Sequence, residues 1–409
     1  MLRPARVGLT LMLAACGGGE PAADGLQLLT PPVGEGSLTP VASALPDGGA
    51  LLSWLEPAAG SGERGSSTRG GAYRLRMAEW DGRGWSEAQT VAQSEAYFVN
   101  WADFPGVVSL EDGTRLAYWL ERDSDGSYDY RIRVALWDGA VWSEPWTLHD
   151  DESPAEHGFV SMVPAAEGAL LAWLDGRHTG GSGHGGAMSL HARLVTGIAT
   201  MGPDLELDGR TCDCCQTDMA VTDEGVVVVY RDRSPEEIRD IWSVRRGPDG
   251  AWSEPRPVHV DGWEIAACPV NGPAVAAQGS TVVVAWFTAP ADVRQVNVAF
   301  SRDGGRSFAP PLRVDGGDPI GRVDVRMKED GAALVSWVED LGNGEAEIRV
   351  REVTASGATS EPWVITRTSS ARASGFPRLT RFQGGVLVAW TDDALGRVRA
   401  AVLPWGEAP

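Results

Sequence analysis

Short apolar runs that end on an aromatic residue recur seven times along the chain, each followed by polar residues. The closing residues are Trp54, Trp119, Trp173, Tyr230, Trp286, Trp337 and Trp390, and neighbouring copies lie 51 to 65 residues apart. Runs of β-branched and aromatic residues broken by Gly, Asp and Pro predict strands joined by hairpins. This period leaves room for four short strands in each copy, and such sheets bury their faces by stacking on one another.

The unit is most complete at residues 279–314, where an apolar strand, an alternating strand and a tight turn at residues 301–308 follow one another. Repeats of this length and composition predict an all-β, seven-bladed β-propeller of four-stranded antiparallel blades, with a six-bladed propeller as the alternative. The last unit holds only three strands before the chain ends. We therefore expect the N-terminal strand at residues 26–31 to complete the last blade and remove two open sheet edges.

The first residues have the pattern of an export signal. Arg3 and Arg6 precede a short apolar run, and Leu-Ala-Ala leads into Cys16. This ending resembles the bacterial lipoprotein signal, which implies a lipid on Cys16, while an ordinary secretory signal is the alternative. The predicted domains are a signal peptide at 1–15, an anchor and tether at 16–25, and one propeller at 26–409. The resemblance implies an outer-membrane lipoprotein of the cell envelope, facing either the periplasm or the exterior.

The negative net charge of the chain limits the classes of molecule that it is expected to bind. With 35 basic and 56 acidic residues, the formal net charge is −21. A chain this acidic is not expected to bind nucleic acid. We expect a monomer that is attached to the membrane through Cys16 and binds a metal, a glycan or a protein partner.

The cysteines of the predicted propeller lie in two short segments of the chain. Apart from Cys16, the cysteines are Cys212, Cys214, Cys215 and Cys268, which precede the fourth and fifth apolar runs. In a propeller, loops leading into the innermost strands share one face with loops between the second and third strands. The four cysteines are therefore predicted to meet Arg231, Asp232, Arg233, Glu236, Arg239 and Asp240 there, with Trp101, His157, Trp263, Asn271, Arg322 and Asp324 at neighbouring positions.

Four clustered cysteines have three chemical interpretations. Disulfides are favoured in an exported protein, and four cysteines allow three pairings. A Cys-x-Cys-Cys segment with a distant Cys also suits a soft metal, copper or zinc, and redox exchange is the third option. Trp101 and Trp263 lie outside the repeat frame, so ligand stacking and local packing are equally open for them. The predicted ligand-binding residues are Trp101, His157, Arg231, Asp232, Trp263 and Asn271.

The turn at residues 301–308 carries a family resemblance. Its pattern, formed by Ser301, Asp303, Gly305, Ser307 and Phe308, resembles the Asp box (BNR repeat) of the sialidase superfamily. The resemblance implies that Asp303 caps its own turn and lies far from any active site. The resemblance therefore implies a fold, with a six-bladed sialidase-type propeller as the alternative to seven blades, and does not imply a chemical activity.

The resemblance also implies a test of activity. Sialidases use three arginines on the substrate carboxylate, a Tyr nucleophile paired with Glu, and an Asp acid/base. Here the segment at 36–41 reads GSLTPV without Arg, and no Tyr follows Tyr230. Charge alone nominates Arg231, Arg239 and Arg322 as a carboxylate clamp with Glu236 or Asp240 as proton donor, but ion pairs that hold the loops are favoured. We expect a ligand-binding propeller that does not hydrolyse sialosides, with an exo-α-sialidase-type hydrolase with a divergent active site as the alternative.

Overall fold

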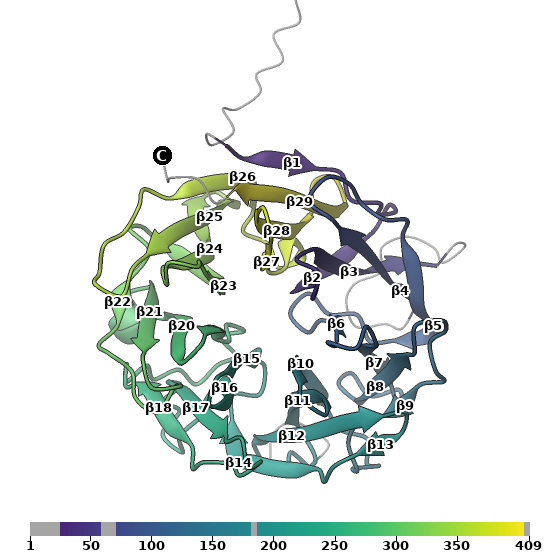
Figure 1. Cartoon of the computed structure of the whole chain (residues 1–409). Helices are drawn as coiled ribbons and strands as arrows, with labels where there is room; N and C mark the ends of the chain where they lie inside the picture. The colour runs from purple at the N-terminus through teal and green to yellow at the C-terminus, as the bar shows by residue number, and fades with distance from the viewer. Residues whose placement is uncertain (1–24, 59–70, 181–185, 405–409) are drawn as a thin grey trace, which may run out of the picture.

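The computed structural model describes residues 25–58, 71–180 and 186–404, which form antiparallel sheets arranged around a ring (Figure 1). The only helical segments there are two short 3₁₀ turns, η1 (Pro290–Asp292) and η2 (Arg372–Ser374). The all-β, propeller-like fold expected from the sequence is confirmed. Within the same described residues, no helix is long and apolar enough to cross a membrane.

The first three groups of strands follow the chain order from the innermost strand outward. The first is β2 (Leu38–Ala44), β3 (Ala50–Pro57), β4 (Gly71–Trp80) and β5 (Gln89–Tyr97); the second is β6 (Gly106–Ser109), β7 (Arg115–Arg122), β8 (Tyr130–Trp137) and β9 (Trp146–Thr147). These two join into one eight-stranded sheet through a single residue pair, Tyr97 with Glu121. The third is β10 (His157–Ala165), β11 (Gly168–Asp175), β12 (Met188–Gly197) and β14 (Leu205–Thr211), with the short β13 (Thr200–Met201) also on β12.

The remaining groups repeat the same order. They are β15 (Asp218–Thr222), β16 (Gly225–Arg231), β17 (Ile241–Arg246) and β18 (Arg256–His259); β19 (Ala274–Gln278), β20 (Thr281–Thr288), β21 (Gln295–Ser301) and β22 (Leu312–Arg313); β23 (Pro319–Met327), β24 (Ala333–Gly342), β25 (Glu345–Val353) and β26 (Trp363–Ser369); and β27 (Arg378–Phe382), β28 (Gly385–Asp392), β29 (Arg397–Pro404) and β1 (Gln27–Leu29). Divided at the Tyr97–Glu121 pair, the described strands fall into seven such groups, which we call units 1 to 7 in this order.

The ring is closed by the two ends of the chain. Strand β1 pairs antiparallel with β29, with Leu28 opposite Ala401 and Leu29 opposite Ala400. The N-terminal strand is three residues long, shorter than expected, and it is the outermost strand of unit 7, as predicted. It covers the hydrogen-bonding edge that β29 would otherwise expose.

The aromatic residues of the repeat form the core between neighbouring sheets. The six tryptophans and Tyr230 are at most 2% exposed. In four copies the indole N–H donates to a carboxylate two residues later: Trp54 to Glu56, Trp119 to Glu121, Trp173 to Asp175 and Trp337 to Glu339. A buried indole N–H needs such an acceptor, which explains why the repeat reads aromatic, any residue, acid.

We expect the β1 closure to contribute to stability through one side chain. Leu29 is 6% exposed and belongs to the same buried apolar cluster as Trp80 and Phe382, whereas Leu28 on the same strand is 52% exposed. Leu29→Ala should lower the free energy of unfolding by about 2 kcal/mol because it removes buried apolar contacts. Chemical denaturation measures the loss, and Leu28→Ala is the matched control. Equal effects of the two substitutions would show that β1 does not close the ring in solution.

Candidate functional site

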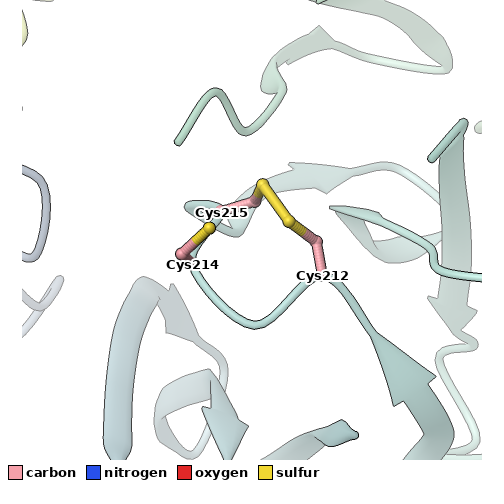
Figure 2. Close-up of side chains that lie close together, drawn as sticks. All are labelled: Cys212, Cys214 and Cys215. Carbon is pink, nitrogen blue, oxygen red and sulfur yellow. A yellow bond between two sulfur atoms is a disulfide. The ribbon is translucent and has the colours of Figure 1, made fainter. Parts of the chain in front are cut away.

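Cysteines from two loops meet on one face of the ring, which we call the cysteine face. Cys212 and Cys215 form a disulfide in the loop between β14 and β15. Cys214 lies between them in sequence as a partly buried free thiol beside the disulfide (Figure 2). Cys268, in the loop between β18 and β19, is free and exposed, and it lies close enough to Cys214 for each thiol to shift the pKa of the other. The two loops therefore carry one disulfide and two free thiols.

The backbone of both loops is fixed by specific hydrogen bonds. The Cys212 N–H donates to the Arg231 carbonyl over 2.9 Å, which holds the first loop against the end of β16. The Gln216 side chain accepts from Gly272 N–H over 2.9 Å and donates to the Ala102 carbonyl over 2.7 Å. Only glycine fits at position 272, because a Cβ atom there would lie 2.0 Å from the backbone carbonyl oxygen of Gln216. These contacts bring the two cysteine loops and the loop before β6 together.

Basic side chains surround the sulfur atoms. Arg239, 3% exposed, donates through Nη1 to Cys212 Sγ over 3.3 Å and through Nη2 to Glu237 over 2.7 Å. Arg233 binds Glu237 and, over 2.6 Å, Asp213. The hydrogen bond from Cys214, helped by Arg239 and Arg233, lowers the pKa of Cys268 to about 7, and the same bond raises the pKa of Cys214.

The arginines nominated for a carboxylate clamp are occupied by the protein itself. Arg231 is 1% exposed and donates to the Asn271, Phe287 and Arg239 carbonyls. Arg322 is 4% exposed and donates to Ser374 Oγ and to the carbonyls of residues 370, 371 and 375. Burial lowers the pKa of each to about 10. Both guanidinium groups therefore connect neighbouring units by donating to backbone carbonyls and, for Arg322, to a hydroxyl group.

The acidic candidates are also explained by the loop structure. The Asp240 carboxylate accepts from the N–H groups of Gly262 and Trp263. Glu236 is exposed, and Asp232 is partly buried, with a pKa that burial raises to about 7. The ion pairs expected between residues 231 and 240 are present, but their centre is Glu237, which the sequence did not single out.

The other predicted ligand-binding residues differ in exposure. His157 is 0% exposed, with Nδ1 against the Tyr130 carbonyl and Nε2 3.1 Å from Asp151. Trp263 is 6% exposed, packs edge-on against Phe287 and lies under the Arg231 guanidinium. Trp101 is partly exposed but stacks on Phe376 with Arg322 over its ring. Local packing, one of the two alternatives for Trp101 and Trp263, accounts for these contacts.

Two predicted residues line a hollow on this face. A space of about 610 Å³ between units 5 and 6 is lined in part by Trp263, Asn271, Arg294 and Asp340. The Asn271 side-chain N–H groups donate there to the carbonyls of Pro269 and Ile320, and its side-chain oxygen accepts from the Arg322 N–H. Arg294 pairs with Asp340 across it. The Asn271 amide and the Arg294–Asp340 pair that line the hollow therefore already have partners within the protein.

A buried acidic cluster beside the cysteines was missed from the sequence. The Tyr130 hydroxyl lies 2.9 Å from Asp103 Oδ2 and 3.0 Å from Glu156 Oε1. Burial raises the pKa of Asp103 to about 7 and that of Glu156 to about 8, and Asp213 and Cys268 add to the rise at Glu156. Both carboxyl groups therefore hold their protons to a higher pH than exposed carboxyl groups do. The three residues come from separate segments and share no local motif.

A second set of ligand-type side chains is explained without an ion. Atoms of Asp151, His157 and Asp175 lie within 4.8 Å of one another. However, the Asp175 carboxylate already accepts from Arg177 Nε over 2.7 Å and Trp173 Nε1 over 2.9 Å. His149 stacks on His157 with ring centroids 3.7 Å apart. This set is an internal ion-pair and hydrogen-bond network of units 2 and 3.

The turn at residues 301–308 has the geometry that the resemblance implied. Asp303 accepts from the Ser307 N–H over 2.9 Å and from the Ser307 and Ser301 hydroxyls, and Gly305 N–H donates to Ser301 Oγ. These bonds lower the pKa of Asp303 to about 2 against the opposing effect of burial. Phe308 packs against the core between units 4 and 5. Cys16 and the tether lie outside the described residues, so lipidation and envelope location stay predictions.

Comparison with known proteins supports the fold. No protein-family model matches the chain, and no curated protein sequence matches it. A protein of unknown function from Dyadobacter fermentans has 15% identity and a TM-score of 0.54, covering 93% of this chain and 99% of its own. The PL25 ulvan lyase bound to -[GlcA(1-4)Rha3S]- has 12% identity and a TM-score of 0.58, covering 92% and 96%.

Sialidases are also among the similar structures, at greater distance. The Hadza microbial sialidase Hz136 has 14% identity and a TM-score of 0.44, covering 74% of this chain and 63% of its own. At these identities the comparisons bear on the arrangement of the sheets and not on the chemistry of a site. The chain is therefore similar in its propeller-like fold to the polysaccharide lyase and to the Dyadobacter fermentans protein.

Proposed function

We propose that the protein is an exported binding propeller that holds a soft metal ion, Cu(I), between Cys214 and Cys268. The observation that carries the proposal is that these two cysteines, from different loops, are the two free thiols of the described residues and lie close enough for each to shift the pKa of the other. The remaining cysteines of the cluster, Cys212 and Cys215, are joined to each other, which leaves this pair as the two sulfur ligands. Thiolates select Cu(I), and zinc prefers four ligands, so a two-sulfur site favours copper.

The exposure of the pair suits an ion that arrives from solution. Cys268 is exposed and Cys214 is partly buried, so one ligand receives the ion and the other shields it. Arg239 and Arg233 lie close enough to act on the Cys268 sulfur, where they favour the thiolate that a metal requires. The Gln216 contacts hold both loops in place before any ion binds.

Binding without hydrolysis is the second part of the proposal. The substrate carboxylate of a sialidase needs free guanidinium donors, and Arg231 and Arg322 donate to the protein's own carbonyl and hydroxyl groups. The chain also has no tyrosine after Tyr230, whose side chain is buried. A fluorogenic sialoside should therefore not be turned over, and turnover above the buffer rate would favour the hydrolase alternative.

The decisive measurement is Cu(I) binding. The chain carrying Cys16→Ser should show two free thiols and bind one Cu(I) in competition with a chromogenic Cu(I) chelator. Cys268→Ser and Cys214→Ser should each weaken binding by at least about 100-fold, because each removes a ligand. Asp303→Ala, in the Asp-box turn, is the matched control and should bind as the parent does. No free thiols, or unchanged copper affinity in Cys268→Ser, would overturn the proposal.

A further inference from the structure

We propose that reduction of the Cys212–Cys215 disulfide converts the two-sulfur copper site into a four-thiolate site for a tetrahedral ion, Zn(II). This inference rests on the proposed role of Cys214 and Cys268 as metal ligands. It assigns the disulfide a second state in which all four cysteines of the cysteine face bind one ion. The redox state of the cluster then decides which metal the protein takes.

The sulfur positions already approach those of a four-sulfur site. The Sγ atoms of Cys212, Cys214 and Cys215 lie within 4.8 Å of one another, and the Cys214 side chain lies next to the disulfide (Figure 2). Zinc–sulfur bonds of about 2.3 Å place tetrahedral sulfur atoms roughly 3.8 Å apart. Cys268 lies close enough to Cys214 for the two thiols to influence each other, and it supplies the fourth sulfur atom. It is not among the three sulfur atoms that lie within 4.8 Å of one another, so its loop has to move toward the disulfide to enclose an ion.

Arg239 is better matched to the reduced state than to the disulfide. Its Nη1 donates to Cys212 Sγ over 3.3 Å, although a disulfide sulfur is an uncharged and weak acceptor. Its Nε is buried without a hydrogen-bond partner among the described residues. A metal-bound thiolate carries negative charge and accepts such a bond more strongly. The guanidinium thus supplies the outer hydrogen bond that a zinc-bound Cys212 thiolate needs.

The buried disulfide has a route to a reductant in solution. Cys212 and Cys215 are at most 1% exposed, whereas Cys268 is exposed. The Cys214 thiolate attacks Cys212, forming a Cys214–Cys212 bond and releasing Cys215, which takes up the proton that Cys214 lost. Cys268 then attacks Cys214 and frees Cys212 in the same way, which moves the disulfide to the exposed pair.

An external dithiol completes the reduction. It gives two electrons and two protons to the Cys214–Cys268 disulfide and becomes a disulfide itself, leaving four thiols in the protein. Zinc then displaces protons from these thiols as it binds, so that the sulfur ligands are thiolates. The dithiol is the only co-reactant that the step requires.

The test compares oxidised and reduced chains carrying Cys16→Ser, prepared without oxygen and counted for thiols. The reduced chain should bind one Zn(II), with an affinity at least about 100-fold above that of the oxidised chain. Substituted Co(II) should give the visible absorption and the sulfur-to-metal charge-transfer bands of a tetrahedral thiolate site. The cobalt spectrum is read on an otherwise unaltered cluster, so it does not depend on whether a cysteine variant folds.

Variants separate this inference from the proposed function. Cys212→Ser/Cys215→Ser should lose the gain in zinc affinity on reduction, whereas Asp303→Ala should keep both that gain and the Cu(I) site. If the oxidised chain binds no Cu(I), the proposed function fails, whatever zinc does. If Cu(I) binds but reduction raises zinc affinity less than tenfold, or the cobalt spectrum is that of an octahedral site, the four-thiolate inference alone is overturned.

Discussion

Replacement of Arg231 by methionine is expected to lower the free energy of unfolding by about 3–5 kcal/mol. The guanidinium is 1% exposed and is the donor for three backbone carbonyls, those of Asn271, Phe287 and Arg239. Methionine fills a similar length but has no donor, so these carbonyls become buried acceptors without partners. The three carbonyls belong to different segments of units 4 and 5, so the substitution should weaken the packing of these two units against each other.

Chemical denaturation of both proteins measures this effect. The matched control is Arg302→Met, the same substitution at an exposed arginine, which should change stability by less than about 0.5 kcal/mol. The Arg231 backbone carbonyl, at the end of β16, accepts from the Cys212 N–H, so displacement of this strand end in Arg231→Met should weaken Cu(I) binding as well. A stability loss below about 1 kcal/mol would mean that Arg231 is not the connector described here.

The ring of sheets was predictable because each repeat of the sequence carries the same pattern of buried positions. Each copy needs an apolar strand that ends on a large aromatic side chain, and Trp54 and Trp286 meet that need at equivalent positions. The closing role of β1 followed from a strand count, because the last unit lacked a fourth strand. The pairing of Leu29 with Ala400 confirms it.

The sequence was enough to predict which loops form the cysteine face, but not which of their side chains are exposed. Propeller topology brings the loops before β15 and β19 to one face, so Cys214 and Cys268 were expected to meet. Which side chains point to solvent depends on contacts that no local pattern carries, such as Gln216 with Gly272, 56 residues apart. For the same reason Arg231, nominated from its charge, is a buried connector.

Replacement of Asp103 by asparagine is expected to stabilise the protein at alkaline pH, which is unusual for a buried polar residue. Burial raises the pKa of Asp103 to about 7 in the folded state, whereas the unfolded value is near 3.9. Between these two values the folded protein binds more protons, so the wild-type loses stability as the pH rises, and the loss is complete above about pH 7. Asparagine does not titrate and can still accept from the Phe159 N–H, as Asp103 does over 2.8 Å.

Denaturation curves from about pH 4 to about pH 9 test this prediction. Asp103→Asn should exceed the wild-type by about 2–4 kcal/mol near pH 8, and the advantage should vanish near pH 4. The groups that face Asp103 are Tyr130, Glu156 and Tyr118, and Glu156 keeps its own raised pKa, so part of the slope remains. Asp249→Asn, at an exposed position, is the control and should follow the wild-type curve. Parallel curves for Asp103→Asn and wild-type would mean that burial does not raise the pKa of Asp103 in the folded protein.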